Sequence, residues 1–96
     1  MNTTINAVKF RADEKLVQYI NEKINKLDRM IDNAIGCEVT LKVDKPESDN
    51  NKIVDIRIAR PGQDLFISKQ ADSFEQAISE GIDAIKPQLE KLKDRQ

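Results

Sequence analysis

The chain has 96 residues, of which 39% are hydrophobic and 34% are charged, and its net charge is −1. This length supports one domain with a single modest core, covering residues 1–96, and the nearly neutral charge excludes a strong overall attraction to nucleic acid. Histidine is absent and Cys37 is the one cysteine, which excludes an intramolecular disulfide, a histidine-ligated zinc site and a catalytic triad with a histidine base.

The first half of the chain predicts a strand, a helix and a second strand. Thr3–Val8 is rich in β-branched residues and predicts a strand. From Asp13, a good N-cap, to Ile31 the apolar residues recur every three or four positions, which predicts an amphipathic helix. The period changes to two over Cys37–Val43, and this alternation predicts a strand whose odd-numbered residues face the core.

Two more strands follow a polar loop at 46–51. Val54–Ile58 alternates in the same way, with the even-numbered residues inward. Arg60–Gln63 has the proline and glycine of a turn, and Leu65–Ala71 predicts the last strand. Three consecutive apolar residues at Leu65–Ile67 leave the facing of this strand open and are compatible with a β-bulge.

A second amphipathic helix begins near Phe74. Ser73 and Gln76 have the spacing of a capping box, in which each side chain bonds the other residue's backbone N–H. Pro87 interrupts this helix and predicts a kink or an early end. The element order β-α-β-β-β-α predicts an α+β fold, in which two helices pack on one face of a four-stranded mixed sheet.

No enzymatic activity, metal or cofactor is expected. No carboxylate pair lies in an apolar setting that would separate the two pKa values, and the glycines are isolated rather than gathered in a phosphate-binding loop. Cys37 lies in an alternating apolar run and is expected to be buried. The chain also lacks a secretory signal and an apolar run of about 20 residues, so we expect a soluble cytoplasmic protein.

The charges of the first helix permit two interpretations. Lys15, Lys26 and Arg29 lie away from its apolar stripe, while Lys23 flanks the stripe and Tyr19 lies between these cations. The pattern fits an ordinary solvated face. It also fits a basic surface with an aromatic ring available for stacking on RNA.

The second helix carries both signs of charge. Its outer face carries four carboxylates, at Glu80, Asp83, Glu90 and Asp94. Cations lie toward its flanks and its C-terminal end, at Lys86, Lys91, Lys93 and Arg95. Cations near the end of a helix also complement its dipole, which is a purely structural reason for their position.

Several short segments, taken together in order and spacing, resemble one known family over nearly the whole chain. These segments are Phe10–Asp13, Lys23–Leu27, Leu41–Lys45, Phe74–Ile78, Ile82–Asp83 and Gln88–Lys93. The family is that of the ribosome hibernation promoting factors and ribosome-associated translation inhibitors, also called sigma-54 modulation proteins. The chain is similar to its short members, which stop after the second helix, whereas long members add a dimerising domain.

The resemblance implies a domain akin to double-stranded-RNA-binding domains that occupies the messenger and tRNA channel of the small ribosomal subunit. Bound there, it would keep idle ribosomes inactive in stationary phase and under stress, without catalysis or a cofactor. The sequence shows no clear self-association surface, so a monomer is the default expectation. Position by position, the resemblance assigns contact with ribosomal RNA to Lys23, Lys26, Lys42, Lys91 and Lys93, and proximity adds Arg29, Lys86 and Arg95.

The chain departs from the family at two places on the second helix. Ala84 and Pro87 stand where relatives often carry lysine and arginine, so two phosphate contacts are expected to be missing, with weaker and less salt-dependent binding as the consequence. The alternative that stays open is a regulator that binds another protein through the acidic face of the second helix.

Overall fold

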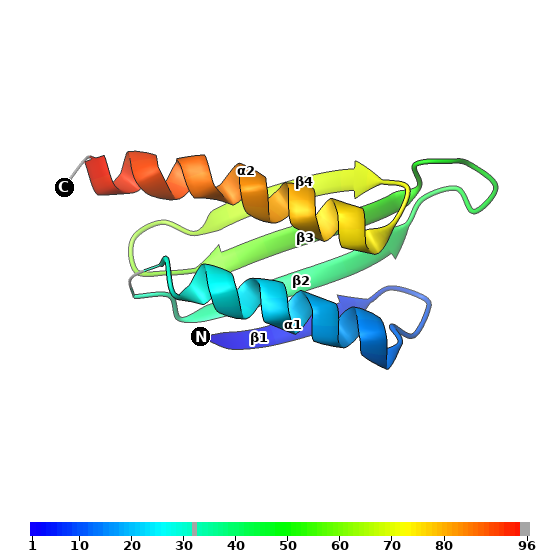
Figure 1. Ribbon diagram of the computed structural model, residues 1–96, viewed down its shortest axis with the longest axis horizontal. Helices are drawn as coiled ribbons and strands as arrows, with labels where there is room; N and C mark the ends of the chain where they lie inside the picture. The colour runs from blue at the N-terminus through cyan, green and yellow to red at the C-terminus, as the bar shows by residue number, and fades with distance from the viewer. Residues whose placement is uncertain (32, 95–96) are drawn as a thin grey trace.

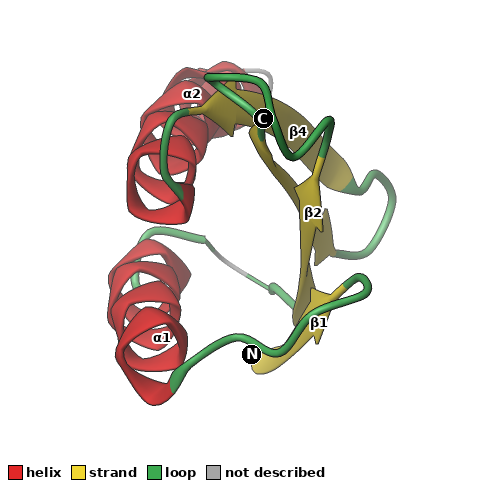
Figure 2. Ribbon diagram, turned by 90° about the vertical axis from the view of Figure 1, so that its right-hand side faces the viewer, coloured by secondary structure: helices red, strands yellow, loops and turns green. Residues whose placement is uncertain are grey.

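Two helices cover one face of a four-stranded sheet, and the other face of the sheet is uncovered (Figures 1 and 2). The computed structural model describes residues 1–31 and 33–94, with side chains as far as Lys91. The elements in chain order are β1 (Asn2–Ala7), α1 (Glu14–Asp28), β2 (Gly36–Val43), β3 (Lys52–Ala59), β4 (Leu65–Ala71) and α2 (Phe74–Asp94). The predicted β-α-β-β-β-α fold is therefore confirmed.

The strands lie in the order β1-β2-β3-β4. β1 and β2 are parallel and are joined through α1, whereas β2, β3 and β4 form an antiparallel meander. The β3–β4 register runs without a break from Lys52 opposite Ala71 to Ile58 opposite Leu65. The β-bulge that the sequence suggested in β4 is therefore wrong.

The two helices run in the same direction. β1 and β4 point the same way in the sheet, and each is followed by a helix that returns across the same face. Figure 1 shows both helix N-termini at the right and both C-terminal ends at the left. This alignment places equivalent ends of α1 and α2 side by side.

The core lies between the helices and the covered face of the sheet. Its largest fully buried members come from α1, β2, β3 and α2 and are Ile20, Ile24, Leu27, Val39, Leu41, Val54, Ile56, Ile58, Ile78 and Ile85. The predicted facing of β2 and β3 is confirmed for all positions except Val43. That side chain is 40% exposed because it lies at the end of β2, beyond the cover of the helices.

α1 begins as predicted and ends earlier. The Asp13 carboxylate accepts a hydrogen bond from the Leu16 N–H at 2.8 Å, so Asp13 is the N-cap. At the other end the Met30 N–H bonds the Leu27 carbonyl, and this tighter turn stops the helix at Asp28 instead of Ile31. Ile31 still reaches the core, being 7% exposed.

α2 departs from two predictions. The Gln76 N–H bonds Ser73 Oγ at 3.1 Å, but the Gln76 side chain bonds the Glu80 carboxylate instead of reaching back to Ser73, so half of the predicted capping box forms. The helix also continues through Pro87 to Asp94, and the expected early end is wrong. Pro87 is exposed, so the lost N–H bond faces water and the packing of α2 on the sheet is retained.

Gly81 lets α2 lie close to the sheet. It is buried, and a Cβ atom at this position would stand 3.0 Å from the Cδ1 atom of Ile56 on β3. Within residues 1–31 and 33–94, no helix combines the length and the apolar character that a membrane crossing requires.

Candidate nucleic-acid interface

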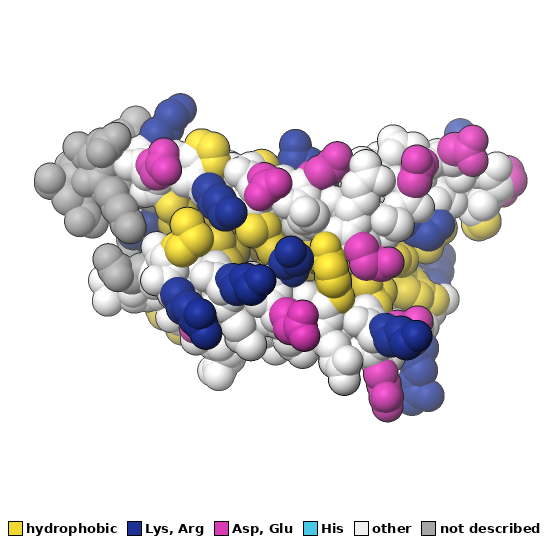
Figure 3. All heavy atoms as spheres, viewed as in Figure 1, with side chains coloured by type: hydrophobic (Ala, Val, Ile, Leu, Met, Phe, Trp, Pro, Cys, Tyr) yellow, Lys and Arg dark blue, Asp and Glu magenta, His cyan; other side chains and the backbone are white. Residues whose placement is uncertain are grey.

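A groove of about 240 Å³ follows the seam between α1 and α2. Figure 3 shows basic side chains gathered along this seam around hydrophobic side chains, with acidic side chains along the outer edge of α2. The groove is lined by Lys23, Lys26, Leu27, Met30, Ser79, Ile82, Asp83 and Lys86. We call this set the lysine groove.

Helical spacing explains why these lysines meet. Lys23 and Lys26 are three residues apart on α1 and flank the buried stripe that contains Ile24. Lys86 flanks the buried stripe of α2 next to Ile85. Once both stripes are buried side by side, the flanking lysines from the two helices face one gap, and their long stems cover its apolar floor.

The charges of the lysine groove leave an excess of positive charge. It contains three lysines and one aspartate. Asp83 lies 3.7 Å from the Lys86 ammonium, whereas Lys23 and Lys26 make no ion pair with any side chain in the described part of the chain. The two lysines of α1 are therefore available to phosphate groups.

Tyr19 fixes the position of Lys23. The Lys23 ammonium lies over the Tyr19 ring, 5.5 Å from its centroid, and the Tyr19 hydroxyl donates to the Glu75 carbonyl at 3.4 Å. The first contact is a cation–π interaction and the second joins α1 to the start of α2. The predicted closeness of Tyr19 to the α1 cations is confirmed.

The structure separates Lys42 from the lysine groove. Lys42 lies on the uncovered face of the sheet, where its ammonium is 2.8 Å from the Asp55 carboxylate. Burial raises the pKa of Asp55, but hydrogen bonds from Lys42 and Ser68 and the charge of Lys42 outweigh it and hold the pKa below its usual value. An ion pair this tight leaves Lys42 with little net charge to offer RNA.

The remaining predicted residues lie apart from the groove lining. Arg29 is exposed at the C-cap of α1, and Lys91 is exposed on α2. Neither residue lines the lysine groove. The Lys93 side chain and Arg95 fall outside the described part of the chain. The structure thus brings together Lys23, Lys26 and Lys86 from the predicted set of cations.

Sequence reasoning missed Ser79, whose half-buried side chain lines the groove between the lysines. It also missed the contact between Phe10 and Phe74, whose rings stack with centroids 5.3 Å apart and planes 12° apart. The two phenylalanines are distant in sequence. The available signal was that each lies three residues after the end of a strand that leads into a helix, at equivalent positions of the two β-α units.

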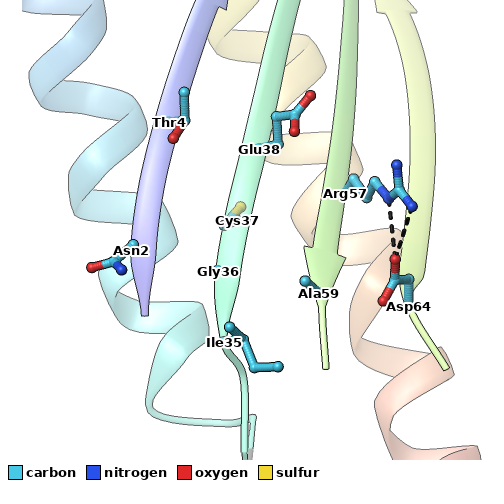
Figure 4. A pocket seen from close by; sticks show the side chains of 9 residues that line it. All are labelled: Asn2, Thr4, Ile35, Gly36, Cys37, Glu38, Arg57, Ala59 and Asp64. Atoms are coloured by element: carbon cyan, nitrogen blue, oxygen red, sulfur yellow. Dashed lines mark hydrogen bonds and ion pairs between the residues drawn. The ribbon is translucent and has the colours of Figure 1, made fainter. Parts of the chain in front are cut away.

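The uncovered face of the sheet has a different character. A hollow of about 360 Å³ near one end of β1, β2 and β3 is lined by both signs of charge and by small polar residues (Figure 4). Arg57 there donates to Asp64 at 3.0 Å, and Glu38 lies across the sheet from it. Positive charge on this face is largely neutralised.

Cys37 belongs to the core, as predicted. Its side chain is 3% exposed, and burial raises the pKa of the thiol to about 11. The thiol is therefore protonated near neutral pH and a poor nucleophile. Among the described residues, no group of His, Cys, Asp and Glu side chains is placed to hold a metal ion.

The chain is a small α+β domain with a basic seam between its two helices, and comparison with known proteins identifies its family. Residues 3–96 match the family described as "Sigma 54 modulation protein / S30EA ribosomal protein". The chain belongs to this family, and the resemblance found in the sequence is confirmed.

Individual relatives agree with this assignment. The chain is 29% identical over 83 residues to a ribosome hibernation promotion factor of Deinococcus radiodurans, which covers 85% of this chain and 44% of that protein. The chain therefore spans less than half the length of this relative.

Two solved structures have the same fold. The N-terminal domain of Thermus thermophilus Protein Y superposes with a TM-score of 0.80 at 18% identity, covering 96% of this chain and 99% of that one. A ribosomal subunit interface protein from Coxiella burnetii gives a TM-score of 0.82 at 18% identity, with coverage of 98% and 99%.

Proposed function

We propose that the chain is a ribosome-binding translation inhibitor that occupies the messenger and tRNA channel of the small subunit and keeps idle ribosomes inactive. The family to which it belongs consists of ribosome-associated factors that are not enzymes. Binding to ribosomes would place the protein in the cytoplasm, where a role in stationary phase and under stress follows from the storage of idle ribosomes.

The lysine groove is the observation that carries this proposal. Lys23 and Lys26 are free of ion pairs within the described chain and stand across the seam from Lys86. Phosphate contacts supply most of the sequence-independent affinity of proteins for nucleic acid. A local excess of positive charge in a groove can therefore attract RNA although the whole chain is slightly acidic.

The proposed contacts outside the groove contribute unequally. Lys91 is exposed further along α2, and Arg29 follows the end of α1, so both can extend the positive surface beyond the groove. Lys93 and Arg95 remain predicted contacts from the resemblance. We expect the smallest contribution from Lys42, because Asp55 already neutralises it.

Co-sedimentation tests the proposal directly. The protein is mixed with purified 30S, 50S and 70S ribosomal particles at low salt, and each mixture is pelleted through a sucrose cushion. We expect the protein to pellet with 30S and 70S particles, and the Lys23→Glu, Lys26→Glu variant to stay in the supernatant while its circular dichroism spectrum and melting temperature are retained. Wild-type protein that stays wholly in the supernatant, or that pellets with 50S particles alone, refutes the proposal.

A second candidate function uses the acidic side of α2. Glu80, Asp83 and Glu90 are exposed on α2, and Figure 3 shows acidic side chains along the outer edge of this helix. Such an edge could bind a basic protein instead of RNA. Capture experiments from lysate with and without ribonuclease separate the two functions, because a direct protein partner remains bound after the RNA is digested.

A further inference from the structure

A second hollow continues the seam at the N-terminal ends of the helices. It has a volume of about 570 Å³, within the usual range for pockets that hold small organic groups. Its lining is formed by Phe10, Arg11, Ala12, Asp13, Lys15, Leu16, Tyr19, Phe74 and Glu75. We call it the aromatic hollow.

The aromatic hollow and the lysine groove meet at Tyr19. The Tyr19 side chain lines the hollow, while its ring carries the ammonium of Lys23, which lines the groove. Its hydroxyl bonds the backbone of Glu75, which also lines the hollow. A single extended ligand can therefore contact both sites.

The charges of the hollow do not suit a phosphate. Two carboxylates, Asp13 and Glu75, line it together with the cations Arg11 and Lys15. The Asp13 carboxylate accepts the Leu16 N–H through one of its oxygens as the helix N-cap, whereas no hydrogen bond to the exposed Glu75 carboxylate forms within the described residues. Because the two signs balance, the hollow offers a phosphate no net positive charge, whereas a neutral group with N–H donors would find carboxylate acceptors.

The rest of the lining suits a flat ring. Phe10 is half-buried and stacks on the buried Phe74, the half-buried Tyr19 adds another ring, and Arg11 is exposed next to Phe10. Proteins bind unpaired RNA bases by stacking them on aromatic rings and guanidinium planes, and they read the base by hydrogen bonds to its edge. Aromatic rings, a guanidinium and one free carboxylate occur together in this hollow.

We propose that the aromatic hollow binds one unpaired nucleobase of the RNA strand whose phosphates lie in the lysine groove, and that Glu75 accepts a hydrogen bond from an exocyclic amino group of that base. This inference rests on the proposed RNA-binding function. Carboxylates accept hydrogen bonds from the amino group of cytosine, whereas uracil carries a carbonyl oxygen at the same position. The hollow should therefore favour cytosine over uracil.

Two matched RNA probes test the inference. Oligocytidine and oligouridine of equal length carry the same phosphate charge and differ at the base edge, and fluorescence anisotropy at constant salt gives both affinities. We expect tighter binding of oligocytidine by roughly 5- to 100-fold, the range of one good base contact. Inorganic polyphosphate of matched charge serves as a probe without bases.

Two variants assign the preference to the hollow. Glu75→Gln should weaken oligocytidine binding and remove most of the preference, because the amide lacks the charge that favours the amino donor. Tyr19→Ala should weaken both RNAs by about 5- to 100-fold, the usual effect of removing a stacking ring, and should change polyphosphate binding much less. Phe66→Ala is the matched control, because Phe66 is 56% exposed on the opposite face of the sheet.

The outcomes distinguish the two proposals. Equal affinity for both RNAs, with no effect of Glu75→Gln, refutes the base site and leaves the ribosome-binding function standing if the Lys23→Glu, Lys26→Glu variant still loses binding. Equal weakening by Tyr19→Ala and Phe66→Ala also refutes it. Absence of all RNA binding at low salt refutes both proposals. If the Tyr19→Ala protein is destabilised, the Glu75→Gln variant still tests the base site, because Glu75 is exposed and its replacement should not disturb folding.

Discussion

Replacing the two free lysines of α1 should change the salt dependence of RNA binding by a fixed amount. Each phosphate neutralised on a single strand contributes about −0.7 to the slope of log K against log salt concentration. If Lys23, Lys26 and Lys86 each neutralise one phosphate, the lysine groove supplies a slope of about −2.1. The variant Lys23→Gln, Lys26→Gln should lose about 1.4 of this slope, whatever other contacts exist.

The expected change is large enough to measure. Raising salt from about 50 to about 200 mM should weaken groove binding by about 18-fold in the wild type and by about 2.6-fold in the variant. Glutamine keeps a good helix propensity, and the loss of the Lys23–Tyr19 contact should cost at most about 1 kcal/mol of the free energy of unfolding. Anisotropy titrations of a labelled single-stranded RNA at several salt concentrations give the slopes.

The control removes the same charge from another surface. Lys9 and Lys45 are exposed in the loops after β1 and β2 and line neither the groove nor the aromatic hollow. The variant Lys9→Gln, Lys45→Gln should keep the slope within about 0.3 of the wild type, since neither lysine lines the groove and so neither would neutralise a phosphate there. An unchanged slope in the α1 variant would show that Lys23 and Lys26 do not contact phosphates, and an equal loss in the control would show that net charge and not the groove determines binding.

Three further predictions concern the scaffold. Asp55→Asn should lower the melting temperature at pH 7, because a carboxylate whose pKa is lowered by folding stabilises the fold at pH values above its unfolded pKa. The difference between variant and wild type should shrink below about pH 4 and disappear as the pH falls through the pKa of Asp55 in the folded protein. An undiminished difference at pH 3 would contradict the role of the Lys42 ion pair. Cys37 should resist a thiol reagent at pH 8 until the protein is unfolded, because its thiol is buried and has a raised pKa. Mass spectrometry measures the labelling, and rapid labelling of the native protein would contradict this prediction. Gly81→Ala should change the free energy of unfolding by less than about 1 kcal/mol, since improved helix propensity offsets a slight shift of the Ile56 side chain. Gly81→Val should lower the free energy of unfolding, measured by chemical denaturation, by about 1 to 3 kcal/mol. Equal effects of both variants would refute the close packing.

The fold could be predicted because the spacing of apolar residues in the sequence corresponds to the positions that are buried in the structure. The α1 stripe from Leu16 to Leu27 and the alternation from Cys37 to Leu41 are both determined by which side of an element meets the core. The early end of α1 could not be predicted in this way. Ile31 continues the apolar period, but its side chain can reach the core from a tight turn as well as from a helix.

The candidate site depends on contacts that sequence patterns do not contain. Periodicity places Lys23 beside the α1 stripe but does not say which element lies next to that side, so its meeting with Ser79 and Lys86 required the packing of α2. The pairing of Lys42 with Asp55 likewise depends on the β2–β3 register, in which Asp55 lies diagonally across from Lys42. A shift of one residue would place the two charges on opposite faces of the sheet.

The parallel course of the two helices gives the seam a polarity. Its head, where both helices start, carries aromatic rings and charges of both signs, whereas its tail carries an excess of ammonium groups, so the two ends are chemically unlike. A nucleic-acid strand is itself directional, with its 5′ and 3′ ends distinguishable at every sugar. The two orientations of a strand along the seam are therefore not equivalent, because reversal changes which sugar and linkage atoms lie between a base in the aromatic hollow and the phosphates in the lysine groove.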